Sequence, residues 1–260
     1  MTKVLKIVKC YLLIYKRTLQ KLVQREVTTV FMDEIRGRKF LVLIDESRDV
    51  SIKEQMIVIL RFMNDEGKVV ERFLGLQHVQ SCTAIALKEA LVSMLSSHNL
   101  SISMLCGQGE ISSELLVCMA AFNPRNSFSN FDVDKLVRLA EIYAKDFDMG
   151  DLTILPNQLK QFVNRARRTP EFLGCTELGK VAEIMVKTNM HTSYKLVYRL
   201  IELTLILPVA TASVDKIFLA MSIIKTDLRS KMGDEWLNDL MICYNEKEIF
   251  RKIDNEKIKK

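Results

Sequence analysis

The sequence lacks the cysteine and histidine spacing that zinc-binding and disulfide-bonded folds require. Its only histidines, His78, His98 and His191, lie far apart in 260 residues, and its six cysteines include no C-x-x-C pair. Structural zinc sites and disulfide frameworks place such residues at short, regular intervals. The isolated histidines also give no serine or cysteine nucleophile a neighbouring base. The sequence therefore predicts reduced thiols and no metal site.

The chain also lacks an apolar segment of the ~20 residues that a membrane-spanning helix needs. Lys6 and Lys9 interrupt the apolar N-terminal stretch, and the first carboxylate is that of Glu26. A basic start without acidic residues is also typical of organelle presequences. No small-residue cleavage site of a secretory signal follows it. We expect a surface helix that leads into the first strand, in preference to a targeting segment, and no membrane partner.

The composition is that of a folded protein with one large domain or two small ones. Hydrophobic residues make up 48% of the chain, which is enough for a substantial core. The net charge of +6 suits an acidic partner, but a charge of this size is common. The basic cluster at 165–168 and the lysine-rich end at 257–260 could contact DNA phosphates, or could be solvated surface. Weak DNA binding is therefore one open alternative.

The first part of the chain predicts strands. Phe40 to Asp45 is a short apolar run that ends in a carboxylate, which is typical of a buried strand. The runs 54–63 and 68–79 flank the turn residues at 64–67, so they predict a hairpin.

A helix and a further strand are predicted after the hairpin. Apolar residues recur at helical spacing from Thr83 to His98, and Ser81 or Thr83 can cap this helix. Ile102 to Leu105 favours a fourth short strand, which ends at the glycine turn 107–109. Strand, hairpin, helix and strand together predict half of a mixed α/β sheet.

The remainder of the chain predicts helices. The segments 133–147, 159–168 and 177–190 have helical periodicity, with breaks expected at Pro124, Pro156 and Pro170. We expect a partial sheet domain at 1–110, a helical connecting segment at 111–192 and a C-terminal region at 193–260.

The C-terminal region carries the most regular apolar stripes. The segment 194–207 predicts a helix, or a helix and a strand, that ends at Pro208. Two amphipathic helices are expected at 213–232 and 235–250. Their stripes face either the core or a partner; the sequence alone does not decide between them, and the core is the default. The residues expected to serve dimerisation are Ile217, Phe218, Met221, Ile224, Leu228, Trp236, Leu237, Leu240 and Tyr244.

Asp45 is the residue with the clearest chemical potential. Ribonuclease-H-like nucleases and transposases place their first metal ligand where a central strand ends before a hairpin. Two-metal catalysis at a phosphate requires several carboxylates that converge from separate elements. Asp45 could supply one of them.

Two longer stretches carry a family resemblance. The run Leu43-Ile44-Asp45-Glu46-Ser47-Arg48-Asp49, with Arg72-Phe73-Leu74-Gly75 and Gly107-Gln108-Gly109 downstream, resembles the catalytic region of plant hobo/Activator-type (hAT) transposases and of the related zinc-finger MYM-type proteins. The runs 123–128, 207–218 and 224–229 are similar to the C-terminal dimerisation region of the same family. Together these stretches span about residues 25 to 250.

The resemblance implies a fold, a location and partners. It implies a truncated ribonuclease-H-like α/β sheet, followed by an all-helical C-terminal hAT dimerisation region. It also implies a protein derived from a transposable element, residence in the nucleus, and pairing with a second copy or with another hAT-family protein. Mg²⁺ would be the cofactor of any remaining nuclease activity; otherwise no cofactor is expected.

The resemblance also implies that the catalytic triad is incomplete. Asp45 matches the first catalytic aspartate, but the second, which normally follows the Gly-Gln-Gly turn, is absent, and Glu110 stands there. The third is a glutamate in the family and Asp215 here, which would displace a bound metal by roughly 1 to 1.5 Å. Asp215 could instead stabilise the start of a helix by ~0.3 to 1 kcal/mol.

The family's long insertion before the Asn-Pro-Arg region is reduced here to about a dozen residues, and no cysteine spacing matches its zinc-binding DNA-recognition module. The resemblance therefore implies an internally deleted, inactive protein that retains dimerisation. The alternative is a metal-dependent DNA nuclease or strand-transferase with a degenerate triad of Asp45, Asp215 and Glu110.

Overall fold

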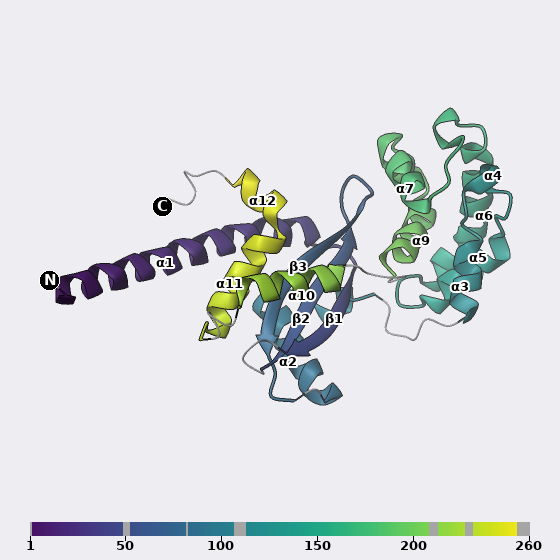
Figure 1. Cartoon of the computed structure of the whole chain (residues 1–260). Coiled ribbons are helices and arrows are strands. Elements are labelled where there is room, and N and C mark those ends of the chain that lie inside the picture. Colours follow the sequence, from purple (N-terminus) through teal and green to yellow (C-terminus); the bar gives the residue numbers. More distant parts are fainter. Residues whose placement is uncertain are drawn as a thin grey trace.

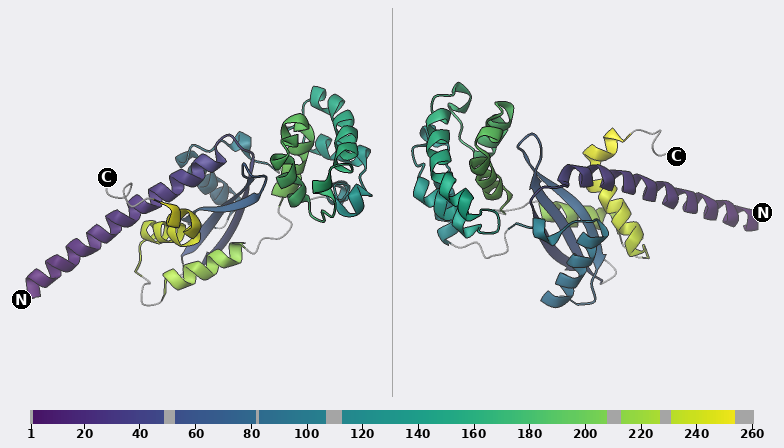
Figure 2. Two further views of the ribbon diagram at one scale, coloured as in Figure 1. Left: turned by 90° about the horizontal axis from the view of Figure 1, so that it is seen from above. Right: turned by 180° about the vertical axis from the view of Figure 1, so that it is seen from behind.

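The computed structural model describes residues 2–48, 53–81, 83–106, 113–207, 213–226 and 231–253. Within these ranges the chain forms a three-stranded antiparallel sheet with helices from both ends of the sequence packed on it, and a separate group of helices (Figures 1 and 2). The predicted fold class, a partial α/β sheet followed by a largely helical region, is confirmed.

The sheet has the order β1-β2-β3 and contains the predicted strands. β1 (Phe40–Arg48) and β3 (Val69–His78) both pair antiparallel with the central β2 (Glu54–Met63). In the tight turn between β2 and β3 the Asn64 side chain accepts the backbone N–H groups of Glu66 and Lys68. Six consecutive residues of β2 are buried, as expected of a central strand that is covered on both faces.

The outer edge of β3 is bound to a side chain of α11 (Asp234–Asn245) and to that of Glu246, the residue that follows this helix. The Leu76 N–H donates to Asn238 Oδ1 at 2.7 Å, and the Phe73 N–H donates to Glu246 Oε1 at 2.8 Å. Between these two bonds a bulge shifts the register, and a Cβ on Gly75 would lie only 3.1 Å from Asn238 Oδ1. Glycine at this position therefore allows α11 to approach the strand.

Two helices of the first 110 residues flank this sheet. The C-terminal half of α1 (Thr2–Ile35) buries Val27 and Phe31 against it, while the N-terminal half extends away from the molecule (Figure 2). α2 (Ala84–Ser97) is capped by Thr83, whose hydroxyl accepts the Ala86 N–H. The predicted surface helix and the Thr83 cap thus appear in the structure.

The fourth strand predicted at Ile102 to Leu105 is wrong. Ile102–Met104 is a 3₁₀ helix, η1, and only Leu105 forms a parallel bridge, to Phe40 of β1. The Ser101 side chain accepts the Ser103 N–H and caps this turn, so local side-chain bonding replaces a strand ladder. The glycine turn predicted at 107–109 lies outside the described residues.

In chain order, a helical unit with its own core lies between the sheet and the C-terminal helices, and it lies to one side of the sheet in space (Figure 1). Edge-to-face aromatic contacts join Phe128, Phe162 and Phe172 inside this core. Its elements are α3 (Ser113–Ala120), α4 (Arg125–Phe128), α5 (Val133–Ile142), α6 (Met149–Ala166), η2 (Pro170–Phe172), α7 (Leu178–Lys187), α8 (Met190–Ser193) and α9 (Lys195–Ile206).

The helix break predicted at Pro156 is wrong, because Pro156 lies inside α6. A proline in a helix interior costs ~3 kcal/mol. The Asp148–Asp151 capping box at the start of α6 and the complete burial of Leu155 and Leu159 oppose that cost.

The helices after residue 212 return to the sheet. α10 (Ser213–Ile224), α11 and α12 (Lys247–Lys252) share one core with β1–β3, α1 and α2. α9, in contrast, packs on α6 and α7 in the helical unit. The two cores therefore group residues 2–106 with 213–253, and most of 113–207 by itself. The domain bounds predicted at 110/111 and 192/193 stay predictions.

The two predicted C-terminal helices also have different bounds. α10 ends at Ile224, and the segment predicted at 235–250 is divided at Glu246 into α11 and α12.

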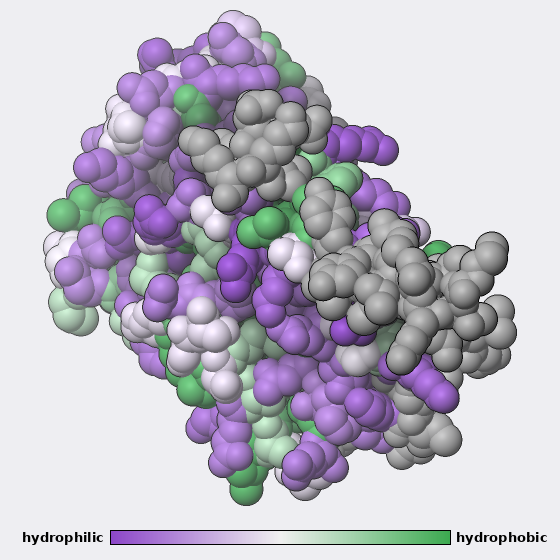
Figure 3. All heavy atoms as spheres, turned by 90° about the vertical axis from the view of Figure 1, so that its left-hand side faces the viewer, coloured by the Kyte–Doolittle hydropathy of each residue, from purple (hydrophilic) through white to green (hydrophobic). Residues whose placement is uncertain are grey.

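Among the described residues, no helix is both long and apolar enough to cross a membrane. On the face at the α1 side of the molecule, hydrophilic residues predominate among those coloured (Figure 3).

Candidate functional site

Asp45 lies on β1, which is an edge strand of the sheet. The Phe40 carbonyl of β1 accepts the Cys106 N–H at 2.8 Å, so the backbone groups of Phe40 point away from β2. Successive residues of a strand direct these groups to opposite sides. The backbone groups of Val42, Ile44 and Glu46 therefore also point to the outer edge, where the described residues place no further strand.

The Asp45 carboxylate lies over this open edge. Asp45 is exposed, and its Oδ1 accepts the outward N–H of Glu46 at 2.8 Å. A carboxylate that accepts a free edge N–H removes a donor that another strand could use. The structure thus gives Asp45 a local role, protection of the strand edge, that requires no metal.

Asp215 and Glu110 complete the predicted triad. Asp215 is exposed in the first turn of α10, where a negative charge complements the helix dipole. Glu110 lies outside the described residues. Within the described ranges, no three His, Cys, Asp or Glu side chains form a group that could hold a metal ion. The metal-ligand roles of Asp45 and Asp215 stay predictions.

The predicted dimerisation residues contribute to the chain's own core instead of an open face. Four are buried, four are partly buried against the same core, and one lies outside the described residues. The buried ones are Ile217, Met221, Ile224 and Leu237, the partly buried ones are Phe218, Trp236, Leu240 and Tyr244, and Leu228 is not described. Their stripe therefore matches the core alternative, and dimerisation itself stays a prediction.

The outward face of α10 carries different apolar residues. Leu219 is 63% exposed and Ile223 is 57% exposed, and the two lie one helical turn apart. Asp215 and Lys216 are exposed at the start of the same helix. This face, which the sequence interpretation did not select, is the part of α10 that remains available to a partner.

The sheet and its flanking helices are also the part of the chain that matches a known family. Residues 11–113 match the ZMYM1/FAM200 RNase-like domain family (DUF4371). The matched segment covers α1 from residue 11 to its end, the three strands, α2 and η1. No curated protein and no solved structure gives a match. The chain therefore contains an RNase-like domain.

One of the motifs that carry the family resemblance has a structural role within the RNase-like domain. Arg72-Phe73-Leu74-Gly75 lies at the bulge of β3, where Arg72 forms ion pairs with Glu34 and Glu246 at 2.8 and 3.3 Å. Burial raises the pKa of Glu246, while the Phe73 N–H and Arg72 lower it. The motif thus joins α1, β3 and the end of α11, which is a structural role.

The motif at 123–128 also has a structural role. Asn126, Ser127 and Phe128 have φ values of 52°, 54° and 60°, a left-handed conformation that non-glycine residues adopt at a cost. The Arg167 guanidinium donates to the carbonyls of Ser127 at 3.0 Å and Phe128 at 2.8 Å. These bonds hold the turn and place the Phe128 ring in the core.

A polar junction joins the RNase-like domain to the helical unit. Lys39 forms an ion pair with Asp146 at 2.7 Å, and the Arg61 guanidinium donates to the Leu205 carbonyl at 3.0 Å. Glu202 of α9 lies in the same region, and burial raises its pKa to about 7, against the opposing effect of nearby cations, first of all Arg38. Glu202 lies within the apolar pattern of α9 and belongs to no distinctive motif. The sequence interpretation therefore missed it.

A pocket between α1 and α11 was also missed. It is lined by Arg17, Lys21 and Arg25 of α1, which recur at four-residue intervals, and by Trp236 and Asp239 of α11. The regular spacing of the three cations was visible in the sequence. Their convergence on α11, which lies some 210 residues later in the chain, was not visible in the sequence.

Proposed function

We propose that this chain is a transposase-derived protein that uses its RNase-like domain as a scaffold, does not cleave nucleic acid, and acts by association with a second copy or a relative. The position of Asp45 carries the proposal. Its carboxylate bonds to the neighbouring backbone on an exposed strand edge, and the described residues do not form with it a group of three or more side chains that could hold a metal ion. Two-metal cleavage needs such a group.

The proposed association uses the outward face of α10. Leu219 and Ile223 expose apolar surface, whereas the inward stripe is occupied by the sheet. α11 is bound to β3 through Asn238 and Glu246, so withdrawal of the C-terminal helices from the sheet would break buried hydrogen bonds. An interface on the outer face forms without that cost.

Light scattering coupled to size exclusion tests the association. The chain has a mass of 30.0 kDa, so a dimer has twice that mass, about 60 kDa, at micromolar concentration. Leu219→Lys is expected to shift the mass to that of a monomer. Ile154→Lys, at a similarly exposed position on α6, is the matched control and should leave it unchanged. A monomeric wild-type protein would contradict the proposal.

A nuclease assay tests the inactivity. With Mg²⁺ or Mn²⁺ and single- or double-stranded DNA, the wild type and Asp45→Asn should both give the background rate. If the wild type cleaves DNA and Asp45→Asn does not, Asp45 is a metal ligand and the alternative nuclease function is correct.

A further inference from the structure

Helix α1 carries apolar residues that do not belong to the face it packs on the sheet and α11. That packed face contains Val23, Val27 and Phe31, all of which are buried. Leu19 and Leu22 lie outside it and are 38% and 37% exposed. The helix therefore contributes to the core on one side and presents large apolar side chains to solvent on another.

In the sequence, Leu19 and Leu22 belong to a seven-residue repeat. Its a positions are 5, 12 and 19 and its d positions are 8, 15 and 22, occupied by Leu5, Leu12, Leu19, Val8, Tyr15 and Leu22. We call these six residues the α1 seam. α1 is one continuous helix, and its N-terminal half extends away from the rest of the molecule (Figure 2). Apolar a and d positions over three heptads of one helix are the pattern of a coiled coil.

The length of the α1 seam suits one partner helix. Residues 5 to 22 cover about 26 Å of helix axis at 1.5 Å per residue. A helix of this length is only marginally stable by itself in water, because most helix stability in proteins comes from the packing of an apolar face. An amphipathic helix of similar length would cover the seam and supply this packing.

The charges beside the α1 seam are all positive. Its flanking e and g positions carry Lys9, Lys16 and Arg25, and the first 25 residues of the chain contain seven cations and no carboxylate. Residues at e and g face the partner helix and select it by charge. If two copies of α1 paired along the seam, parallel or antiparallel, no carboxylate would meet these cations. Charge complementarity therefore favours an acidic helix over a second copy.

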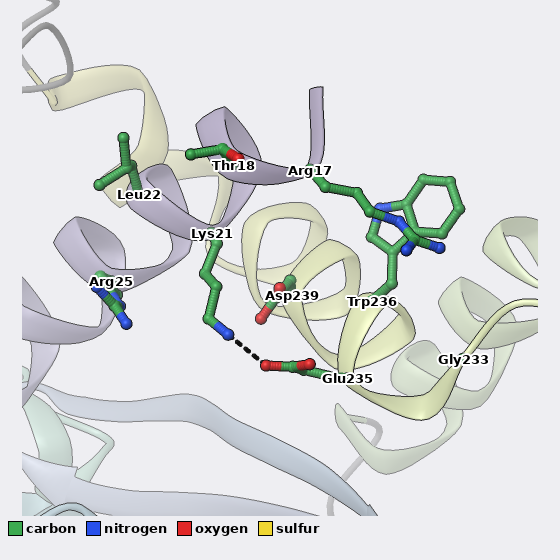
Figure 4. Close-up of a pocket in the computed structure, with 9 residues that line it drawn as sticks. All are labelled: Arg17, Thr18, Lys21, Leu22, Arg25, Gly233, Glu235, Trp236 and Asp239. Atoms are coloured by element: carbon green, nitrogen blue, oxygen red, sulfur yellow. Dashed lines mark hydrogen bonds and ion pairs between the residues drawn. The ribbon is translucent and has the colours of Figure 1, made fainter. Parts of the chain in front are cut away.

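Two other cations of α1 are already engaged by α11. Arg17 lies against the Trp236 ring, and Lys21 forms an ion pair with Glu235 (Figure 4). Lys16, in contrast, is exposed, and among the described residues no carboxylate forms an ion pair with it. Its charge beside the seam is thus available to a partner.

We propose that the α1 seam binds an acidic amphipathic helix of another protein and forms a heterotypic coiled coil with it. The a and d residues of the partner would pack on the six seam residues, and its acidic e and g residues would pair with Lys9, Lys16 and Arg25. This surface lies on a different helix from the outward face of α10, so it adds a second partner to the association proposed above.

Two synthetic heptad peptides test the proposal on the full chain. Both have leucine at a and d; the acidic peptide has glutamate at e and g, and the basic peptide has lysine there. Fluorescence anisotropy of the labelled peptides should show that the acidic peptide binds at least about tenfold more tightly, because opposite charges then flank the seam. The double variant Lys9→Glu/Lys16→Glu should remove this preference.

A second double variant separates the α1 seam from charge alone. Leu12→Lys/Leu19→Lys adds two cations to α1, so binding through charge alone would become tighter. Binding through the seam should instead weaken at least about tenfold, because a positions lie in the interface. Ile85→Lys, at a 73% exposed position on α2, is the control and should bind as the wild type does. Leu219→Lys should also bind normally, so a failure of the association through α10 is distinguishable from a failure here.

Two further measurements identify other occupants of the α1 seam. Sedimentation with vesicles of phosphatidylcholine and phosphatidylserine, without binding of the acidic peptide, would identify an anionic membrane surface instead. A lower mass of Leu12→Lys/Leu19→Lys than of the wild type in light scattering would identify a second copy. Either result overturns the proposal, as does equal binding of the two peptides or of neither.

Discussion

Glu202 makes the stability of the helical unit dependent on pH. Burial raises the pKa of Glu202 from the reference value of 4.5 to about 7 in the folded chain. At pH values between 4.5 and about 7, Glu202 is ionised in the unfolded chain but still protonated in the folded chain. The contribution of Glu202 to stability is therefore greatest below pH 4.5, decreases as the pH rises to about 7, and is constant above that.

The magnitude follows from the size of this shift. Each pKa unit corresponds to ~1.4 kcal/mol, so ionised Glu202 costs the folded state up to about 3 kcal/mol above pH 7. The cations that face it are Arg38 and Lys39, before β1, and Arg199 on its own helix, while Asp146 adds a negative charge. Removal of the charge should recover most of this free energy.

The test is Glu202→Gln, which retains the shape of the side chain and cannot ionise. Urea unfolding at pH 5 and pH 8 should show a variant close to the wild type at pH 5 and more stable by about 2 to 3 kcal/mol at pH 8. Glu141→Gln, at an exposed position on α5, is the control and should give no pH-dependent difference. A stabilisation by Glu202→Gln that is equal at both pH values would refute the reasoning.

Two further variants test the motifs that the structure explains. Gly75→Ala should lower the thermal unfolding temperature, with a loss of about 1 to 3 kcal/mol, because its Cβ would contact Asn238 Oδ1; an unchanged temperature would mean that α11 can move away. Arg167→Ala should destabilise the helical unit by about 1 kcal/mol, because the Ser127 carbonyl loses its side-chain donor and the Phe128 carbonyl keeps only the Phe131 N–H. Arg168→Ala is the matched control, and equal effects of the two arginine variants would contradict a specific role for Arg167.

The sequence predicted the elements whose patterns are local. The strands at 40–45, 54–63 and 68–79 and the helix at 83–98 all occur within a few residues of their expected bounds, because alternation, turn residues and capping act over short distances. Pro156 was misjudged for the opposite reason. A strong cap and buried leucines on either side of it outweigh a local preference.

The candidate sites depended on contacts that the sequence does not show. An apolar stripe has the same pattern whether it faces a sheet or a partner, so the inward orientation of Ile217 and Met221 could not be predicted. The burial of Asp239 could not be predicted either, because it results from the packing of α1 on α11. The even spacing of Arg17, Lys21 and Arg25 was the one local signal that could have marked that surface, and the sequence interpretation did not use it.

The two edges of the sheet explain why association should use α10. The edge at β3 is closed, since Asn238 and Glu246 accept its N–H groups. The edge at β1 is open, but the Asp45 carboxylate accepts the Glu46 N–H there, and a charged residue on an edge strand opposes pairing with another chain. Asp45→Ala should therefore increase association through β1, detected in light scattering as oligomers that Leu219→Lys does not remove. If Asp45→Ala leaves the mass of the Leu219→Lys protein unchanged, Asp45 does not protect the edge.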